Sequence, residues 1–392
     1  MSLPDKNYNN KKKLKILYVI DGLDTGGAEK LLVNTLRNLD RKIFSPSVFL
    51  KCSNAIYKNE FKILKIPLFE LHSSKFFDLS AIIKIFKYIK IEKIDIVHTQ
   101  MFGSDIIGRI ASKLANVDLL ISTYLNVYAW KNNIDLKTRI KTGLDKITAK
   151  YFCDKLIAVS KDVQNFHVKS LKLNINKFHV LVPGINLNEF DSNKYFNPEK
   201  IKMEMGIDLA SYIIIVVGVL SEQKGHKYLI KASSKILKKY PKTHFLILGP
   251  GPLKDNLEKL AREEGVFNQY TFTGYTEKLV ELLYISDLFI SCSLWEGLPQ
   301  VVIEAMSMRK PVIATKVGGL PELIQDKKNG ILIPPKDIPS IINAVIEIRE
   351  NEELQEKISF MGRKTIESRY DIKVMVNELQ KLYINTMENK YG

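Results

Sequence analysis

Short runs of β-branched residues alternate with segments of helical period along almost the whole chain. LKILYVI (14–20) is typical of a buried strand, and GGAEKLLVNTLRNL (26–39) after it places its apolar residues on one face of a helix. Similar strand-like runs recur: IDIVHTQ, DLLIST and KLIAVS in the first half, and YIIIVVGVL, THFLILG, YTFTG, DLFISCS, PVIAT and GILIPP in the second. Because helices between parallel strands cover both faces of a sheet, this alternation predicts an α/β fold built on parallel sheets.

The length of the chain favours two such sheets over one. A chain of 392 residues exceeds what a single hydrophobic core usually supports. The stretch VPGINLNEFDSNKYFNPE (182–199) is rich in turn-forming residues and marks a candidate boundary. We therefore predict a first domain over 14–190 and a second over 191–370. Residues 1–13 are expected to form a basic, disordered tail, and 371–392 a helix that returns to the first domain.

Composition excludes several classes of protein. The 45% of hydrophobic and 26% of charged residues are typical of a globular chain. We expect no membrane-spanning segment, because no apolar run reaches about 18 residues, and no secretion signal, because MSLPDKNYNNKKK has no apolar centre. Three scattered cysteines, Cys52, Cys153 and Cys292, lack the spacing of metal ligands and fit a reducing compartment. A cytoplasmic location is therefore expected.

The positive charge of the chain is unevenly spread. Residues 1–190 hold 31 Lys and Arg against 17 Asp and Glu, a net charge of +14, whereas the remainder holds 28 against 26, a net charge of +2. Such asymmetry suggests that the first half meets an anionic partner, for example a phospholipid surface or a polyanionic saccharide. The alternative explanation of the basic charge is that the source organism uses lysine heavily in all of its proteins. Nucleic acid is not expected as a partner, because the lysines are dispersed and no recognition motif is present.

Residues 293–306, SLWEGLPQVVIEAM, carry two acids eight positions apart, Glu296 and Glu304. A strand-like run precedes them, and a proline lies where a helix is expected to begin. Free backbone amides near Gly297 and Leu298, together with the positive end of the helix dipole, form an anion site that would suit a diphosphate. The second acid, about 8 Å along the helix, could hydrogen-bond a ribose. On spacing alone, a loop glutamate and an ordinary helix glutamate remain the simpler interpretation.

This segment resembles the E-x7-E signature of the family 4 (group 1) glycosyltransferases, which have the GT-B fold. Other motifs similar to those of the family follow in the expected order: VIDGLDTGGAEKLL (19–32), GVLSEQKGHKYLIKA (218–232), LILGPGPLKDNLEKLA (246–261), FTGYTEKLVELLYISDLFISCSLWEG (272–297) and PVIATKVGGLPELIQDKKNGILIPP (311–335). The resemblance covers nearly the whole chain. It implies two Rossmann-like domains that face each other across a cleft, the first for the acceptor and the second for a nucleotide sugar.

The resemblance also implies roles for single residues. Glu304 would bind the ribose of the donor, and Glu296 would hydrogen-bond hydroxyls of the donor hexose. The backbone of Gly297 and Leu298 would meet the donor near its diphosphate. Lys224 would stabilise the negative charge that builds on the diphosphate as the glycosidic bond breaks.

Two further pairs of residues complete the expected donor site. Gly26 and Gly27 would let the N-terminal loop approach the phosphate and the acceptor closely, which a side chain would obstruct. Thr273 and Gly274 lie where the family usually recognises the nucleobase.

Two positions depart from the family's pattern. Val219 stands where an arginine is usual, so one contact to the diphosphate is missing or comes from elsewhere. Leu125 stands where a histidine often lies near the transferred sugar. His98, which we expect to follow a strand on the same side of the sheet, could partly replace that histidine as a catalytic residue beside Glu296 and Lys224. The alternative is a histidine of the core.

The resemblance implies a retaining hexosyltransferase that uses a UDP- or GDP-linked sugar and a saccharide or lipid-linked saccharide acceptor in bacterial cell-surface glycan synthesis. Family members require no metal, and the chain contains no D-x-D motif, so neither metal nor other cofactor is expected. The alternatives are a nucleotide-sugar epimerase or hydrolase of the same fold, or a homologue that binds the nucleotide sugar but is catalytically weak. A nicotinamide dehydrogenase is disfavoured, because no G-x-G-x-x-G follows the first strand.

WKNNIDLKTRIKTGLDKITAKYF (130–152) is basic and places apolar residues at near-helical spacing. Such a helix could lie on an anionic membrane surface. The alternative is that the apolar stripe contacts the core. We expect peripheral association with the inner face of the cytoplasmic membrane. The apolar residues of this stripe are Ile134, Leu136, Ile140, Leu144, Ile147 and Phe152.

Overall fold

The computed structural model describes residues 13–23, 26–52, 57–73, 77–127, 136–191 and 196–391. The chain divides into two compact units, one formed by Met1–Gly184 with Ile372–Gly392 and the other by Ile185–Asp371. The division falls inside the turn-rich stretch 182–199, slightly before the expected boundary at residue 190. The expected basic tail, residues 1–13, lies outside the described residues except for its last position.

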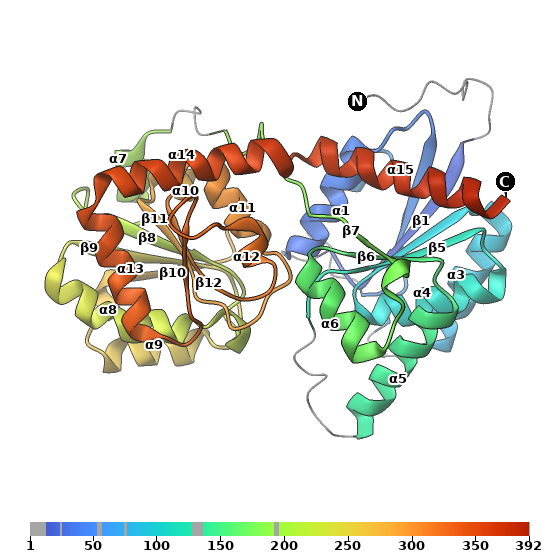
Figure 1. Cartoon of the computed structure of the whole chain (residues 1–392), viewed down its shortest axis with the longest axis horizontal. Helices are drawn as coiled ribbons and strands as arrows, with labels where there is room; N and C mark the ends of the chain where they lie inside the picture. The colour runs from blue at the N-terminus through green and yellow to red at the C-terminus, as the bar shows by residue number, and fades with distance from the viewer. Residues whose placement is uncertain are drawn as a thin grey trace. The chain divides into compact units, whose positions relative to one another are not determined.

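The first unit, in which Figure 1 labels β1, β5, β6 and β7, contains a parallel sheet of seven strands in the order β3-β2-β1-β4-β5-β6-β7. Its strands are β1 (Leu14–Ile20), β2 (Phe44–Leu50), β3 (Leu68–Glu70), β4 (Ile96–Gln100), β5 (Leu119–Tyr124), β6 (Lys155–Ala158) and β7 (Phe178–Val180). Its helices are α1 (Gly27–Asn38), α2 (Lys58–Ile63), α3 (Leu79–Glu92), α4 (Phe102–Ala115), α5 (Leu136–Tyr151), α6 (Lys161–Leu171) and α15 (Ile372–Tyr391).

The second unit contains a parallel sheet of six strands in the order β10-β9-β8-β11-β12-β13. Its strands are β8 (Tyr212–Val217), β9 (Thr243–Leu248), β10 (Tyr270–Gly274), β11 (Leu288–Ser291), β12 (Val312–Thr315) and β13 (Ile331–Ile333). Its helices are α7 (Pro198–Glu204), α8 (His226–Lys239), α9 (Lys254–Glu263), α10 (Leu279–Ile285), α11 (Gln300–Ser307), α12 (Leu320–Leu323), α13 (Ile338–Glu350) and α14 (Glu352–Arg369). Within the described ranges, no helix is both long and apolar enough to cross a bilayer.

The strand order reverses once in each sheet. In the first unit the switch lies between β1 and β4, and in the second between β8 and β11. Loops that leave two neighbouring strands at such a switch diverge to opposite faces of the sheet. Ligands of open α/β sheets bind at this point, beyond the carboxyl ends of the strands. The two switch points are therefore where a functional site is expected in each unit.

The C-terminal helix is part of the first unit's core. Helix α15 buries Met375, Val376, Leu379 and Tyr383 among residues of β1, β2 and α1. Burying an apolar side chain of this size stabilises the folded state by about 1.5–3 kcal/mol. The first unit therefore combines the beginning and the end of the chain.

Candidate functional site

The second sheet brings two of the expected donor-site residues, Lys224 and Glu296, together at its switch point. Strand β8 leads to a 3₁₀ turn, Glu222–Lys224, and β11 leads to the loop that carries Glu296. The two loops touch, because the amide of Leu294 donates a hydrogen bond to the carbonyl of Gln223 at 2.7 Å. Residues more than seventy positions apart in sequence thus become neighbours.

Lys224 and Glu296 form a nearly buried ion pair. The Lys224 ammonium lies 2.5 Å from Oε1 of Glu296, with side-chain exposures of 19% and 5%. The same carboxylate accepts hydrogen bonds from the Ser293 hydroxyl at 2.7 Å and from the Gln223 amide at 3.3 Å. Each carboxylate oxygen therefore has a donor, so the orientation of Glu296 is fixed before any ligand binds.

Glycines allow the loops around this pair to pack closely. Gly225 has a φ of +62°, and a Cβ there would overlap the carbonyl oxygen of Cys292. Gly318 has a φ of +55°, and a Cβ there would overlap the carbonyl oxygen of Glu296. Gly225 lies in the segment 218–232 and Gly318 in the segment 311–335, both of which resemble motifs of the family. Only the structure shows that their function is to let two backbones approach on either side of the ion pair.

Helix α11 begins directly after this loop. Its first residue is Gln300, so the expected start of the helix near the proline is correct. No described residue accepts a hydrogen bond from the backbone amides of Gly297, Leu298 or Gln300. Free amides at the positive end of a helix favour an anion. Glu304 lies one turn further along and is only 2% exposed.

Thr273 and Gly274 end strand β10 at the same edge of the sheet. The Thr273 hydroxyl donates a hydrogen bond to the carbonyl of Gly274 at 2.9 Å, and the amide of Gly249 donates to the same carbonyl at 2.8 Å. In the sheet order, β9 and β8 separate this strand from β11. These residues therefore lie on the carboxyl edge with Lys224, but some distance along it.

In the first unit, Gly26 precedes α1 and Gly27 is its first residue. Gly26 has an ordinary φ of −78°. A Cβ at Gly26 would overlap the carboxylate of Glu29, which is 6% exposed and folds back against the start of the helix. A carboxylate in the first turn stabilises the helix dipole. In the structure, the space that a side chain at Gly26 would need is therefore occupied by the carboxylate of Glu29.

His98 does not follow a strand, as the sequence suggested, but lies within β4 and is 2% exposed. Its Nδ1 lies 2.6 Å from the hydroxyl of Tyr383, and its Nε2 lies 2.6 Å from the hydroxyl of Thr123. Burial lowers the pKa of His98 to about 3, which keeps the ring neutral. Because both nitrogens are engaged in the core, the structure favours the alternative of a core histidine.

The two departures from the family pattern lie in different surroundings. Val219 follows β8 and is 46% exposed, so it presents an apolar side chain where the family usually has an arginine. Leu125 follows β5 and packs against the first unit's core. Neither position supplies a charged group to its switch point.

Two family models match the chain. The model described as Glycosyltransferase Family 4 matches residues 25–189, and the model described as Glycosyl transferases group 1 matches residues 197–365. Together they span both units, and the second match contains Lys224, Glu296 and Glu304.

Relatives and solved structures agree with these matches. The chain is 29% identical to UDP-Gal:alpha-D-GlcNAc-diphosphoundecaprenol alpha-1,3-galactosyltransferase of Escherichia coli over 318 residues, 80% of this chain and 81% of the relative. It is 24% identical to N-acetyl-alpha-D-glucosaminyl L-malate synthase of Bacillus anthracis, with 85% of each chain covered. The structure of Anabaena Alr3699/HepE in complex with UDP-glucose is similar with a TM-score of 0.84 and 20% identity, covering 95% of this chain and all of that one.

Proposed function

Because the chain belongs to the family 4 (group 1) glycosyltransferases and has their GT-B fold, we propose that it moves a hexosyl unit from a nucleotide sugar to a lipid-linked saccharide. The transfer would retain the anomeric configuration of the sugar and would require no metal or other cofactor. It would contribute to the synthesis of cell-surface glycan.

The observation that carries this proposal is the Lys224–Glu296 pair beside the free amides of α11. A diphosphate bound by the amides of Gly297 and Leu298 would lie within reach of the Lys224 ammonium. As the bond between the sugar and the diphosphate breaks, negative charge grows on the phosphate oxygens, and fixed donors stabilise this charge without reorganising. Glu296, held by Ser293 and Gln223, would accept hydrogen bonds from the hexose.

The chemical step needs positioning more than a strong base. The acceptor hydroxyl forms a bond to the anomeric carbon while the bond from that carbon to the diphosphate breaks. The hydroxyl proton passes to the leaving phosphate oxygen, so no protein group changes its charge. Orientation and charge stabilisation then supply the rate enhancement. With His98 in the core, we assign the catalytic roles to Lys224 and Glu296 alone.

Glu304, Thr273 and Gly274 would bind the nucleoside. Glu304 lies on α11 beyond the anion site, where an acid can reach the ribose hydroxyls. The names of the relatives support a uridine nucleotide, since the E. coli relative is named for UDP-Gal and the Anabaena structures contain UDP or UDP-glucose. The same E. coli name, which specifies a diphosphoundecaprenol, supports a lipid-linked acceptor.

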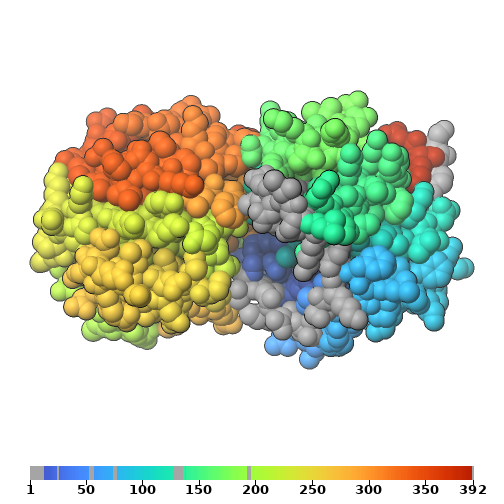
Figure 2. Space-filling model, turned by 90° about the horizontal axis from the view of Figure 1, so that it is seen from below, coloured from blue at the N-terminus to red at the C-terminus, as the bar shows by residue number. Residues whose placement is uncertain are grey.

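Helix α5 supports association with an anionic membrane surface. Leu136, Ile140, Ile147 and Tyr151 fall on one face of the helix and are 73%, 55%, 50% and 62% exposed. Each of them is at least half exposed, whereas Leu144 and Phe152 are half-buried and Ile134 lies outside the described residues. Figure 2 shows the side of the molecule on which α5 lies at the surface of the first unit. An exposed apolar stripe on a lysine-rich helix fits an interface with anionic lipid.

Product analysis tests the proposed reaction. The full chain is incubated with a UDP-sugar and a saccharide linked to a short prenyl diphosphate. We expect release of nucleoside diphosphate only when the acceptor is present, in a one-to-one ratio with the new glycosidic bond. Release of free sugar or of an epimer from the donor alone would instead identify a hydrolase or an epimerase.

A further inference from the structure

Lys51 lies at the carboxyl edge of the first sheet, and its side chain is buried. It follows β2 directly, its amide donates to the carbonyl of Ile20 at 2.9 Å, and its carbonyl accepts from the amide of Ser73 at 2.8 Å. The residue is only 6% exposed. No hydrogen bond or ion pair joins its ammonium to any residue in the described ranges. The ammonium is not among the fully buried, unpartnered atoms of the described residues, so the stem of Lys51 is buried while its charged end keeps contact with solvent.

The side chain of Lys51 reaches the start of α4. A Cβ at Gly103 would lie 3.1 Å from Cε of Lys51 and 2.8 Å from Oδ1 of Asp21. The glycine therefore makes room for both side chains. The Asp21 carboxylate is already engaged, because it accepts hydrogen bonds from the amide and the hydroxyl of Ser104 at 2.6 and 2.8 Å and from the amide of Gly103 at 3.3 Å. The start of α4 thus holds the Asp21 carboxylate, and no ion pair between Asp21 and Lys51 forms among the described residues.

The backbone beside this lysine is strained. Met101, which precedes α4, has a φ of +72° and a ψ of 148°, a region that is adopted almost only by glycine. Its neighbour Gln100 is 7% exposed, and its side-chain oxygen has no hydrogen-bond partner among the described residues. Strain and unpaired buried atoms of this kind collect at ligand sites, where the surrounding structure maintains them.

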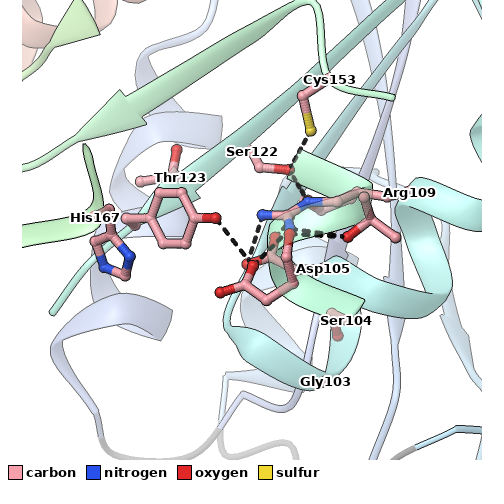
Figure 3. A network of polar contacts seen from close by, with 12 residues as sticks. Gly103, Ser104, Asp105, Arg109, Ser122, Thr123, Cys153 and His167 are labelled. Carbon is pink, nitrogen blue, oxygen red and sulfur yellow. Dashed lines mark hydrogen bonds and ion pairs between the residues drawn. The ribbon is translucent and has the colours of Figure 1, made fainter. Parts of the chain in front are cut away.

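A buried polar network holds α4 in place. The guanidinium of Arg109 donates to Ser122 and Asp145, each at 2.8 Å, and all three residues are 0% exposed. Figure 3 shows this network above Gly103 and Ser104, with Arg109 directed from α4 toward Ser122 on β5. Because α4 is tied to β5 and α5, its first turn cannot relax to remove the strain at Met101.

We propose that Lys51 binds a phosphate group of the acceptor. This inference rests on the proposed function, which places the donor's diphosphate in the second unit. In parallel sheets, ligands bind beyond the carboxyl ends of the strands near the switch point, and Lys51 extends from β2, beside β1, to the start of α4. An ammonium without an anionic partner selects an anion, and a lipid-linked saccharide carries one in its phosphate or diphosphate. The excess of basic residues in 1–190 favours such an acceptor.

Titration with inorganic pyrophosphate, followed by calorimetry, tests the site in the full chain. We expect two binding events in the wild type. Lys51→Gln should weaken one of them at least tenfold, whereas Lys51→Arg should retain it. The matched control, Lys84→Gln, removes an exposed lysine of the same unit and should change nothing. Lys224→Gln should weaken only the other event.

A parallel titration with UDP and GDP identifies the source of the phosphate. If Lys51 serves the acceptor, Lys51→Gln keeps wild-type nucleotide affinity and raises KM for a prenyl-diphosphate-linked saccharide. Equal loss of nucleotide affinity would assign Lys51 to the donor and overturn the proposal. If Lys51→Gln binds pyrophosphate as tightly as the wild type, the Lys51 ammonium contacts solvent and not phosphate. This result would also overturn the proposal. Should Lys51→Gln fail to fold, Lys51→Met replaces it in both titrations.

The two proposals fail in different ways. If no nucleotide binds but pyrophosphate binding still depends on Lys51, the proposed donor site is wrong and the Lys51 site stands. If nucleotide binding depends on Lys224, but pyrophosphate binds in a single event that substitution of Lys51 does not change, the proposed function stands and this inference is wrong.

Discussion

The Lys224 ammonium and the Glu296 carboxylate lie 2.5 Å apart, although they come from loops after different strands. In the absence of ligand, each group compensates the charge of the other. A diphosphate that binds at α11 would compete with Glu296 for Lys224, and a hexose would compete with Lys224 for Glu296. The pair would therefore link occupation of the two parts of the proposed donor site.

This link predicts that substitutions of the two residues are not additive. We expect Lys224→Gln and Glu296→Gln each to lower kcat by about 10²–10³, and the double variant to lose less than the product of the two losses. The measurement is a double-mutant cycle on kcat and KM. The exposed pair Lys227–Glu222, 2.8 Å apart in the same region, is the matched control. Its double-mutant cycle should give a coupling energy near zero. Fully additive losses at Lys224 and Glu296 would contradict the link.

Substitution of Gly225 should disturb this site through the backbone. Alanine at Gly225 must adopt a φ of +62° and also displace the carbonyl of Cys292. Gly265→Ala is the control, because its φ is +69° but no atom lies within 4 Å of the added Cβ. The left-handed conformation costs each variant about 1–2 kcal/mol. We expect the free energy of unfolding of Gly225→Ala, measured with denaturant, to fall by about 1–3 kcal/mol more than that of Gly265→Ala. We also expect Gly225→Ala to have a lower kcat/KM. Equal losses would contradict the close packing.

Glu304 should govern affinity for the nucleoside. Glu304→Gln keeps the shape of the side chain but weakens its hydrogen bonds to ribose, so we expect about tenfold weaker binding of UDP or GDP, or about 1.4 kcal/mol. Thermal shift with both nucleotides measures the loss. Glu353→Gln, an exposed acid at the start of α14, is the control. Unchanged nucleotide affinity in Glu304→Gln would remove this residue from the site.

His98 should contribute to stability in a pH-dependent way. Its pKa is lowered from 6.5 to about 3 by burial, so between these values the unfolded chain binds a proton that the folded chain does not. Stability is then complete above pH 6.5 and falls as the pH drops toward 3, by up to about 1.4 kcal/mol per pH unit. His98→Gln should flatten this slope in unfolding experiments between pH 4 and 7. It should also keep kcat near neutral pH, and a loss of about 10³ there would restore a catalytic role.

Helix α5 should direct the chain to anionic vesicles. We expect co-sedimentation with anionic but not neutral vesicles, reduced by salt because charge contributes to the binding. Ile140→Glu with Ile147→Glu should abolish it. Met203→Glu, which changes an exposed apolar residue of the second unit, should not. Equal binding to both kinds of vesicle would count against the membrane surface.

Most of the fold could be predicted from hydrophobic periodicity, but three strands could not. Strand β2 contains Pro46, which normally argues against a strand inside a sheet, yet it pairs with Ile16 of β1. Strands β3 and β7 have only three residues each, too few for a periodic signal. These strands are recognisable only through their neighbours in the sheet.

The candidate site was predictable as separate motifs and not as contacts. The sequence marks Lys224 and Glu296 individually, but their pairing depends on the adjacency of β8 and β11. His98 was misplaced because a buried histidine and a ligand-facing histidine have the same local sequence. Lys51 carries no motif and stands among many lysines, so only its burial distinguishes it.

The central claim is that the loops around Lys224 and Glu296 bind an activated sugar for transfer. Its most direct test is the initial rate of sugar transfer from UDP- and GDP-sugars to a prenyl-diphosphate-linked saccharide, in the wild type and in the Lys224→Gln/Glu296→Gln double variant. We predict acceptor-dependent transfer with retained anomeric configuration in the wild type, and a rate at least 10²-fold lower in the double variant. Wild-type turnover in the double variant, or inversion of the anomeric carbon, would contradict the account.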